Sequence, residues 1–127
     1  MKYDELLAYQ KSFDLAMKIF ELSKSFPKEE LYALTDQIRR SSRSVAINIA
    51  EAYAKRRYQK HFISKLTDSD AENLETQGWL QFSLACEYID KPVYTNLLSQ
   101  NLEVGKLIHY MINNPEKFGS KKSYPLR

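Results

Sequence analysis

Hydrophobic residues recur along most of the chain at the spacing of an amphipathic α-helix. One stripe repeats every seven residues, with a further member between successive repeats: Leu31, Leu34, Ile38, Ser41, Val45, Asn48 and Ala52. This spacing places the side chains on a single helix face and is typical of helices packed in a bundle. Pro27 suits a first helical turn, so we predict a long helix that begins there and ends near Lys55.

Three further segments carry the same periodicity. Each steps through large apolar side chains: Leu6, Tyr9, Phe13, Met17 and Phe20 in the first, Phe62, Leu66, Leu74, Leu80 and Leu84 in the second, and Leu97, Leu98, Leu102, Leu107, Ile108 and Met111 in the third. Asp4 is predicted to cap the first of these helices, and Asp90 followed by Pro92 to open the last. The helix between them is predicted over residues 58–88.

Four helices joined by short connections pack as antiparallel neighbours. The sequence therefore predicts an all-α fold, an antiparallel up-down-up-down four-helix bundle formed by residues 1–114 of the 127-residue chain. Residues 115–127 carry Lys121, Lys122 and Arg127 without apolar periodicity, and we expect them to form a flexible basic C-terminal tail.

The stripe contains two polar residues, Ser41 and Asn48. A buried amide needs hydrogen-bond partners, because leaving it unpaired costs about 1–3 kcal/mol. In the predicted topology the third helix lies back along the second, so its polar middle can meet these residues. We predict one internal polar layer formed by Ser41, Asn48, Glu51, Asn73 and Gln77.

Residues 45–54 leave hardly any side of their helix polar. A helix that is apolar all round is buried on more than one face. In so short a chain, we expect one face to pack in its own bundle and another to pack against a second copy. The sequence thus predicts a homo-oligomer.

Charge is strongly sorted along the chain, although the formal net charge is only +3. Residues 37–65 have a net charge of +7, with Glu51 as their single acid, whereas residues 66–90 have a net charge of −6. The basic residues of the first stretch are Arg39, Arg40, Arg43, Lys55, Arg56, Arg57, Lys60 and Lys65. They are the candidate nucleic-acid-binding residues, since Lys and Arg neutralise phosphates. The same arginines could instead pair with the acids of the third helix, within a subunit or between subunits.

Several residues in the same region resemble the signature of a known family. They are Tyr9-Gln10, Phe26-Pro27, Glu30, Tyr32, Leu34, Gln37, Arg39-Arg40, Ser44, Asn48-Ile49-Ala50-Glu51 and Leu74-Glu75-Thr76-Gln77. The pattern resembles the four-helix-bundle proteins encoded in intervening sequences of bacterial 23S rRNA genes, which are similar to the accessory proteins of diversity-generating retroelements. The resemblance implies a ring-like homo-oligomer, often pentameric, with a basic surface suited to nucleic acid and no known catalytic activity.

Motifs of enzymes and metal sites are missing from the sequence. Neither His61 nor His109 has a glutamate three residues before it, as a di-metal helical bundle requires. Cys86 is the only cysteine, and no glycine-rich phosphate loop or nucleophile motif occurs. We expect no catalytic residues, metal, cofactor or small-molecule substrate. No apolar run approaches the length of a membrane span and residues 1–10 do not resemble a secretory signal, so a cytoplasmic protein is expected.

Two functions remain open from the sequence. In the first, the oligomer binds RNA or DNA through the phosphate backbone, with Tyr53, Tyr58 and His61 as possible stacking partners for exposed bases. In the second, the protein is a scaffold whose sorted charges form the oligomer or dock a protein partner, without binding nucleic acid.

Overall fold

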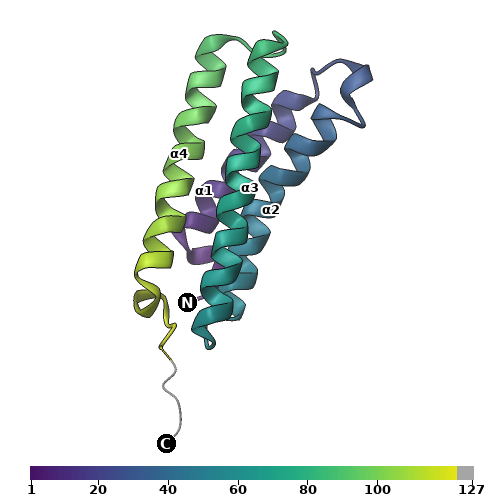
Figure 1. Ribbon diagram of the computed structural model, residues 1–127. Coiled ribbons are helices and arrows are strands. Elements are labelled where there is room, and N and C mark those ends of the chain that lie inside the picture. Colours follow the sequence, from purple (N-terminus) through teal and green to yellow (C-terminus); the bar gives the residue numbers. More distant parts are fainter. Residues whose placement is uncertain (123–127) are drawn as a thin grey trace, which may run out of the picture.

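The computed structural model describes residues 1–122 and shows four antiparallel helices (Figure 1). The helices are α1 (Leu7–Ser23), α2 (Leu34–Ala54), α3 (Gln59–Ala85) and α4 (Lys91–Asn113), with short 3₁₀ turns η1 (Tyr3–Glu5), η2 (Lys28–Glu30) and η3 (Pro115–Phe118). Each helix packs against the next, and α4 packs against α1. The predicted up-down-up-down four-helix bundle is confirmed. Among the helices of residues 1–122, none has the length and apolar character needed to cross a bilayer.

Helix boundaries follow the local capping signals at α4 but not at α1 and α2. Asp90 Oδ1 accepts a hydrogen bond from the Val93 amide at 2.9 Å, which confirms the predicted cap. Asp4 does not cap α1, because it lies inside η1 and the helix begins at Leu7. The prediction that α2 begins at Pro27 is also wrong, because η2 and a turn separate this proline from the helix.

The turn before α2 also moves Leu31 out of the predicted stripe, and its side chain is exposed. The later members of the stripe do point inward. Leu34, Ile38, Ser41, Val45 and Ala52 are all buried, whereas Asn48 is half-buried. The heptad spacing therefore identified the inner face of α2 only within the helix itself.

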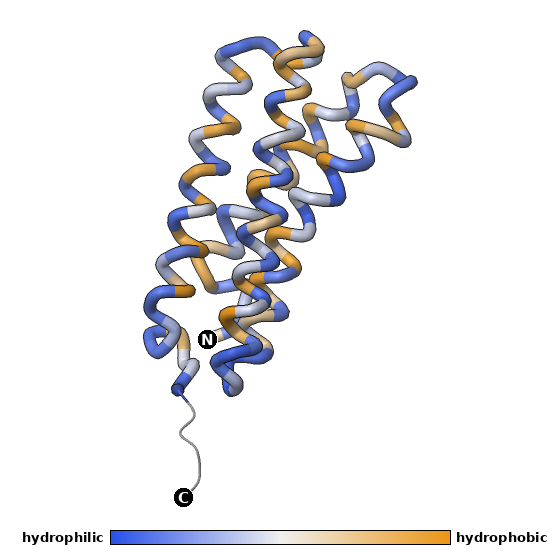
Figure 2. The backbone as a smooth tube through the Cα atoms, viewed as in Figure 1, coloured by the Kyte–Doolittle hydropathy of each residue, from blue (hydrophilic) through white to orange (hydrophobic). Residues whose placement is uncertain are grey.

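The inner face of α1 consists of smaller residues than its apolar spacing suggested. Ala8, Ser12, Leu15, Ala16, Ile19 and Ser23 are buried, whereas Phe13 and Met17 are exposed. Ser12 and Leu15 line the same tightly filled central space as Ser42 of α2. Large aromatic rings would not fit at native density between helices that meet through such small side chains. Figure 2 shows hydrophobic residues along the whole length of the four helices.

A polar layer crosses the bundle between α2, α3 and α4. Ser69 Oγ donates to the Val45 carbonyl at 2.8 Å, and Thr76 Oγ1 donates to Ser41 Oγ at 2.8 Å. Between α3 and α4, Asn73 Nδ2 donates to the Asn101 carbonyl at 3.0 Å and Asn101 Nδ2 donates to the Asn73 carbonyl at 2.9 Å. All five side chains are buried.

The membership of this layer differs from the predicted one. Ser41 and Asn73 belong to it, while Asn48 instead donates to the Ser44 carbonyl of its own helix at 2.9 Å. Glu51 is exposed and Gln77 is half-buried, and neither joins the buried network. Helical spacing placed these residues near the interior, but only the positions facing another helix directly are enclosed.

The C-terminal segment is more ordered than predicted. Residues 115–118 form η3, and Pro115 and Ser120 are buried. The prediction of a flexible tail over residues 115–127 is therefore wrong for residues 115–120. The Phe118 ring packs against the core, and η3 turns the chain back onto the bundle. The rest of that prediction for residues 123–127, Arg127 included, lies outside the described residues.

A hydrogen bond from Tyr88 to Glu30 closes the end of the bundle opposite to the termini. Tyr88 Oη donates to Glu30 Oε2 at 2.8 Å, and this bond raises the pKa of Tyr88 to about 12. The folded state holds the phenolic proton more tightly than the unfolded state, whose pKa is near the ordinary 10.0. The stabilisation from this group is therefore complete below pH 10 and is lost as the pH rises to 12.

We expect Tyr88→Phe to melt at a lower temperature than the wild type at pH 9, because the variant lacks this bond. The difference should shrink as the pH approaches 12. Thermal unfolding followed by circular dichroism at pH 9 to 12 checks this. A difference in melting temperature that stays constant from pH 9 to 12 would show that folding does not change the pKa of Tyr88.

Candidate nucleic-acid interface

The eight basic residues predicted to bind nucleic acid fall into three groups in the structure. The first group, Arg40 and Lys65, is engaged in ion pairs within the subunit. Arg40 contacts Glu72 of α3 at 3.1 Å and also Glu75, whose hydrogen bond raises the pKa of the arginine. Lys65 lies 2.8 Å from Glu51 and lowers the pKa of that carboxyl. These two cations therefore link α2 to α3.

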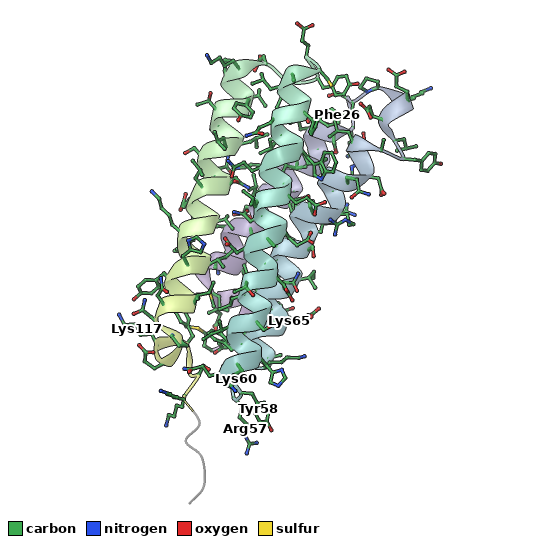
Figure 3. All side chains as sticks on the ribbon, viewed as in Figure 1. Phe26, Arg57, Tyr58, Lys60, Lys65 and Lys117 are labelled. Carbon is green, nitrogen blue, oxygen red and sulfur yellow. The ribbon has the colours of Figure 1, made fainter. Side chains whose placement is uncertain are left out.

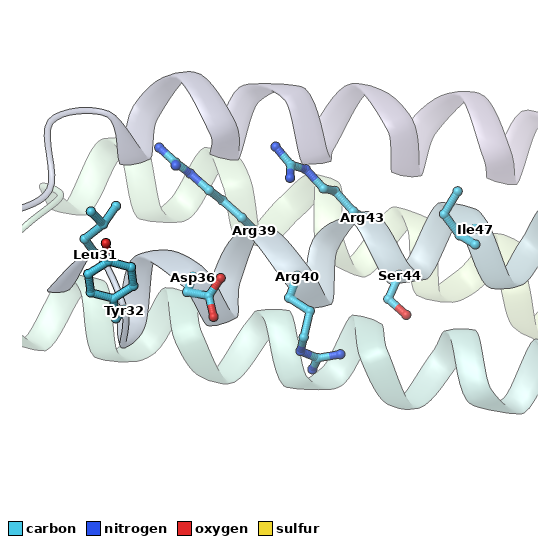
Figure 4. A pocket seen from close by; sticks show the side chains of 8 residues that line it. All are labelled: Leu31, Tyr32, Asp36, Arg39, Arg40, Arg43, Ser44 and Ile47. Atoms are coloured by element: carbon cyan, nitrogen blue, oxygen red, sulfur yellow. The ribbon is translucent and has the colours of Figure 1, made fainter.

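The second group, Arg39 and Arg43, lies on the side of α2 that faces α1. Figure 4 shows both side chains directed toward α1, away from Arg40, which points toward α3. Their guanidinium groups lie over the Phe20 ring, at 4.9 Å and 5.3 Å from its centroid, and Arg39 Nε donates to Ser23 Oγ at 2.8 Å. Cation–π contacts orient the guanidinium groups without neutralising their charge.

The third group occupies the turn between α2 and α3 and consists of Lys55, Arg56, Arg57 and Lys60. Arg56 is held in place: its Nη1 donates to the Tyr53 carbonyl at 2.8 Å, and its guanidinium lies 4.0 Å from the centroid of the Tyr53 ring. Arg57 and Lys60 project from the end of the bundle (Figure 3). In Figure 2 the residues of this turn have the colours of hydrophilic side chains.

The C-terminal segment brings further cations to the same end of the bundle. Gly119, with a φ of 85°, lies so close to the turn that a Cβ on it would be 3.4 Å from Arg56 Nε. Lys117 Nζ donates to Tyr110 Oη at 2.9 Å, and Lys121 and Lys122 follow the glycine. We call the combined surface the basic pole, which consists of Lys55, Arg56, Arg57, Lys60, Lys117, Lys121 and Lys122.

Carboxylates near the basic pole, Glu51 and Glu116, act on Lys55 and Lys117 only through longer-range electrostatics. Within residues 1–122, none of its seven side chains forms an ion pair with a carboxylate. The sequence prediction omitted Lys117, Lys121 and Lys122 from the site. The predicted topology contained the missing signal, because an up-down-up-down bundle brings its C-terminus to the same end as the turn between its second and third helices.

The aromatic residues near the pole differ in accessibility. Tyr53 is buried, its ring is covered by Arg56, and its hydroxyl donates to the Met1 carbonyl at 3.2 Å. It is therefore unavailable for stacking, contrary to prediction. Tyr58 and His61 are exposed and contact each other edge to face, with centroids 5.9 Å apart. These two rings can present a face to a base.

The donors of the pole are of the kind that bind phosphate groups in proteins. It offers lysine and arginine donors next to two exposed rings, but it contains no carboxylate or thiol that could act as base or nucleophile. Groups of three or more His, Cys, Asp or Glu side chains that could hold a metal ion do not occur in the part of the chain that the structure describes.

Comparisons with known proteins agree with the fold. A family model described as 23S rRNA-intervening sequence protein matches residues 4–110. Among solved structures, the chain is similar to a protein of unknown function from the S23 ribosomal protein family of Bacteroides thetaiotaomicron, with 31% sequence identity and a TM-score of 0.77. That similarity covers 89% of this chain and 99% of the other chain. No curated protein matches the chain.

Proposed function

The chain belongs to the 23S rRNA-intervening sequence protein family, and we propose that it is a non-enzymatic homo-oligomer that binds nucleic acid through the phosphate backbone. In this proposal the assembly is a pentamer, it works in the cytoplasm, and its ligand is RNA or DNA. Binding needs no cofactor, metal or small-molecule substrate.

The basic pole is the observation that carries this proposal. Cations from two distant parts of the sequence lie at the same end of the bundle and form no ion pair with a carboxylate among residues 1–122. Like charges held together this way repel each other, so the arrangement favours a polyanionic ligand that neutralises them. Contacts to phosphates carry little sequence information, so binding is expected to depend weakly on base sequence.

Oligomerisation strengthens such a surface. Each subunit contributes one pole, and several poles held in one assembly engage the same polyanion at high effective concentration. A patch that binds weakly in a single subunit then binds firmly in the assembly. Tyr58 and His61 add stacking where the nucleic acid offers unpaired bases.

We expect Arg57→Gln/Lys60→Gln to weaken binding of duplex DNA and to flatten its salt dependence. Each lost phosphate contact lowers the slope of log affinity against log salt by about 0.9, so the double variant should lose roughly two units of slope. Neither side chain forms a hydrogen bond or ion pair within residues 1–122, so the fold should be preserved. A salt series with a labelled duplex DNA and a labelled structured RNA measures this.

The matched control is Lys91→Gln/Lys106→Gln, which removes the same charge from exposed positions of α4. It should leave the slope unchanged. Equal losses in both variants would mean that net charge, not the pole, attracts the nucleic acid. If the folded wild-type protein binds neither ligand at low salt, the proposed function is wrong.

A second candidate function is a scaffold whose charges only organise proteins. The ion pairs of Arg40 with Glu72 and Glu75 favour it, because they already satisfy part of the sorted charge inside the subunit. In this case the charged surfaces form the oligomer or dock a protein partner. An intact oligomer without affinity for nucleic acid would support the scaffold.

A further inference from the structure

Two surfaces of the bundle expose large apolar side chains. We call the first the α1/α2 face, which consists of Phe13, Met17, Phe20, Arg39, Arg43 and Ile47. We call the second the α3 face, which consists of Asp68, Ala71, Leu74, Glu75, Gly78 and Phe82. Contiguous exposed apolar surface of this kind marks interaction sites in soluble proteins.

The α1/α2 face combines an apolar row with arginines. Phe13, Met17 and Phe20 are spaced by four and three residues, so they follow one side of α1. The contact of Phe20 with Arg39 and Arg43 places this row beside α2, where Ile47 continues the same side with 52% of its surface exposed. An open groove of about 630 Å³ runs along α2 from Leu31 and Tyr32 to Ile47 (Figure 4).

The α3 face combines apolar residues with acids. Leu74 and Phe82 are 66% and 59% exposed, more than any other large apolar side chain in the four α-helices. Asp68, which forms no ion pair within residues 1–122, and Glu75, which pairs with Arg40 of the same subunit, flank them, and residues 66–85 contain no lysine or arginine. Asp68 is therefore complementary in charge to Arg39 and Arg43 of the α1/α2 face, which form no ion pair with a carboxylate in residues 1–122. The groove beside these arginines also contains one acid, Asp36.

Gly78 leaves a position on α3 that has no side chain and no close neighbour within the subunit. Glycine is unfavourable inside a helix, yet a Cβ on Gly78 would meet no atom within 4 Å. The contrast is Gly105 of α4, where a Cβ would lie 3.3 Å from Asn73 Nδ2, so a neighbour in the same chain explains the glycine. Nothing inside the subunit explains Gly78.

We infer that the α1/α2 face of one subunit binds the α3 face of a second copy of this chain. The apolar rows pack together, Gly78 lets the partner backbone come close, and Arg39 and Arg43 meet the acids of α3. The contact is heterologous, because it joins two different surfaces, and its repetition closes a ring when the rotation between subunits permits. The inference rests on the proposed homo-oligomer and names the surfaces that build it.

The test uses two variants of the full chain, each with one broken face. Variant A is Met17→Glu/Ile47→Glu, and variant B is Leu74→Glu/Gly78→Gln. Every contact needs one face of each kind, so each variant alone should be a monomer while the wild type is an oligomer. An equimolar mixture should give a dimer, because the intact α3 face of A can bind the intact α1/α2 face of B and growth then stops.

Light scattering measures the mass of each sample, and Leu7→Glu is the control. Leu7 is 52% exposed, as Ile47 is, but it lies about 120° around α1 from Phe13, so its variant should assemble like the wild type. Gly78→Gln alone should weaken assembly without lowering the helical content, since glutamine favours a helix. This single variant keeps the test valid if the charged variants fold poorly.

The possible outcomes separate this inference from the proposed function. If either variant assembles like the wild type, or the mixture stays monomeric, the assignment of the two faces is wrong. A monomeric wild type would overturn the oligomer itself. Nucleic-acid binding is measured on the wild-type protein, whose two faces are intact, so a failure to bind there would overturn the proposed function without touching the assignment of the faces.

Discussion

Replacing Phe62 with alanine is expected to lower the free energy of unfolding by about 3–5 kcal/mol. Phe62 is the largest fully buried side chain, and it lies in the first turn of α3, where it belongs to the core shared with the other helices. The change removes the ring from a closely packed interior and leaves a cavity that the surrounding helices can fill only partly.

A loss of this size is a large part of the roughly 5–15 kcal/mol that stabilises a domain, and it should lower Tm by roughly 10–20 °C. Urea unfolding at a fixed protein concentration measures the free energy, and the matched control is Leu102→Ala, because Leu102 is half exposed on α4. We expect the control to lose well under half as much. Equal losses in the two variants would contradict the complete burial of Phe62.

Replacing Asn101 with alanine is expected to cost about 2–3 kcal/mol. The Asn101 amide is fully buried and donates to the carbonyl of Asn73 at 2.9 Å and to its Oδ1 at 3.0 Å. Alanine leaves Asn73 Oδ1 without its donor and opens a cavity between α3 and α4. The loss is moderated because Asn101 Oδ1 itself has no hydrogen-bond partner in the described structure.

A double-mutant cycle isolates the coupling between the two asparagines. We expect the cost of Asn73→Ala/Asn101→Ala to be about 1 kcal/mol less than the sum of the single losses, because either single change already breaks part of the shared network. Urea unfolding of the four proteins at equal concentration gives the coupling. Additive losses would mean that the two amides stabilise the bundle independently.

The family resemblance, the four helices and the antiparallel order are all confirmed predictions from sequence. They succeed because they depend on repeated local signals. Apolar spacing of three and four residues defines a helix, and the Asp90 cap with Pro92 defines where α4 begins. Boundary signals that rest on a single residue were less reliable, as the positions of Asp4 and Pro27 show.

The candidate site was predictable only in part. The sequence identified the basic residues of α2 and the following turn, but it could not separate Arg40, which faces carboxylates of α3, from Arg57, which does not. Pairing depends on which side chains the packed helices place opposite each other. The contribution of Lys117 also required the topology, because sixty residues separate it from Arg57 in the sequence.

By itself, the sequence determined the helices, their order and the sorting of charge, since these follow from spacing and composition along the chain. Only the tertiary structure decided which of the two apolar sides of α1 points inward. Both sides have helical periodicity, but the side with Ala8 and Ser12 allows the helices to meet closely, whereas the Phe13 ring is too large to lie between them. Packing density, which no local pattern encodes, therefore left an apolar row on the surface and made it available to a partner.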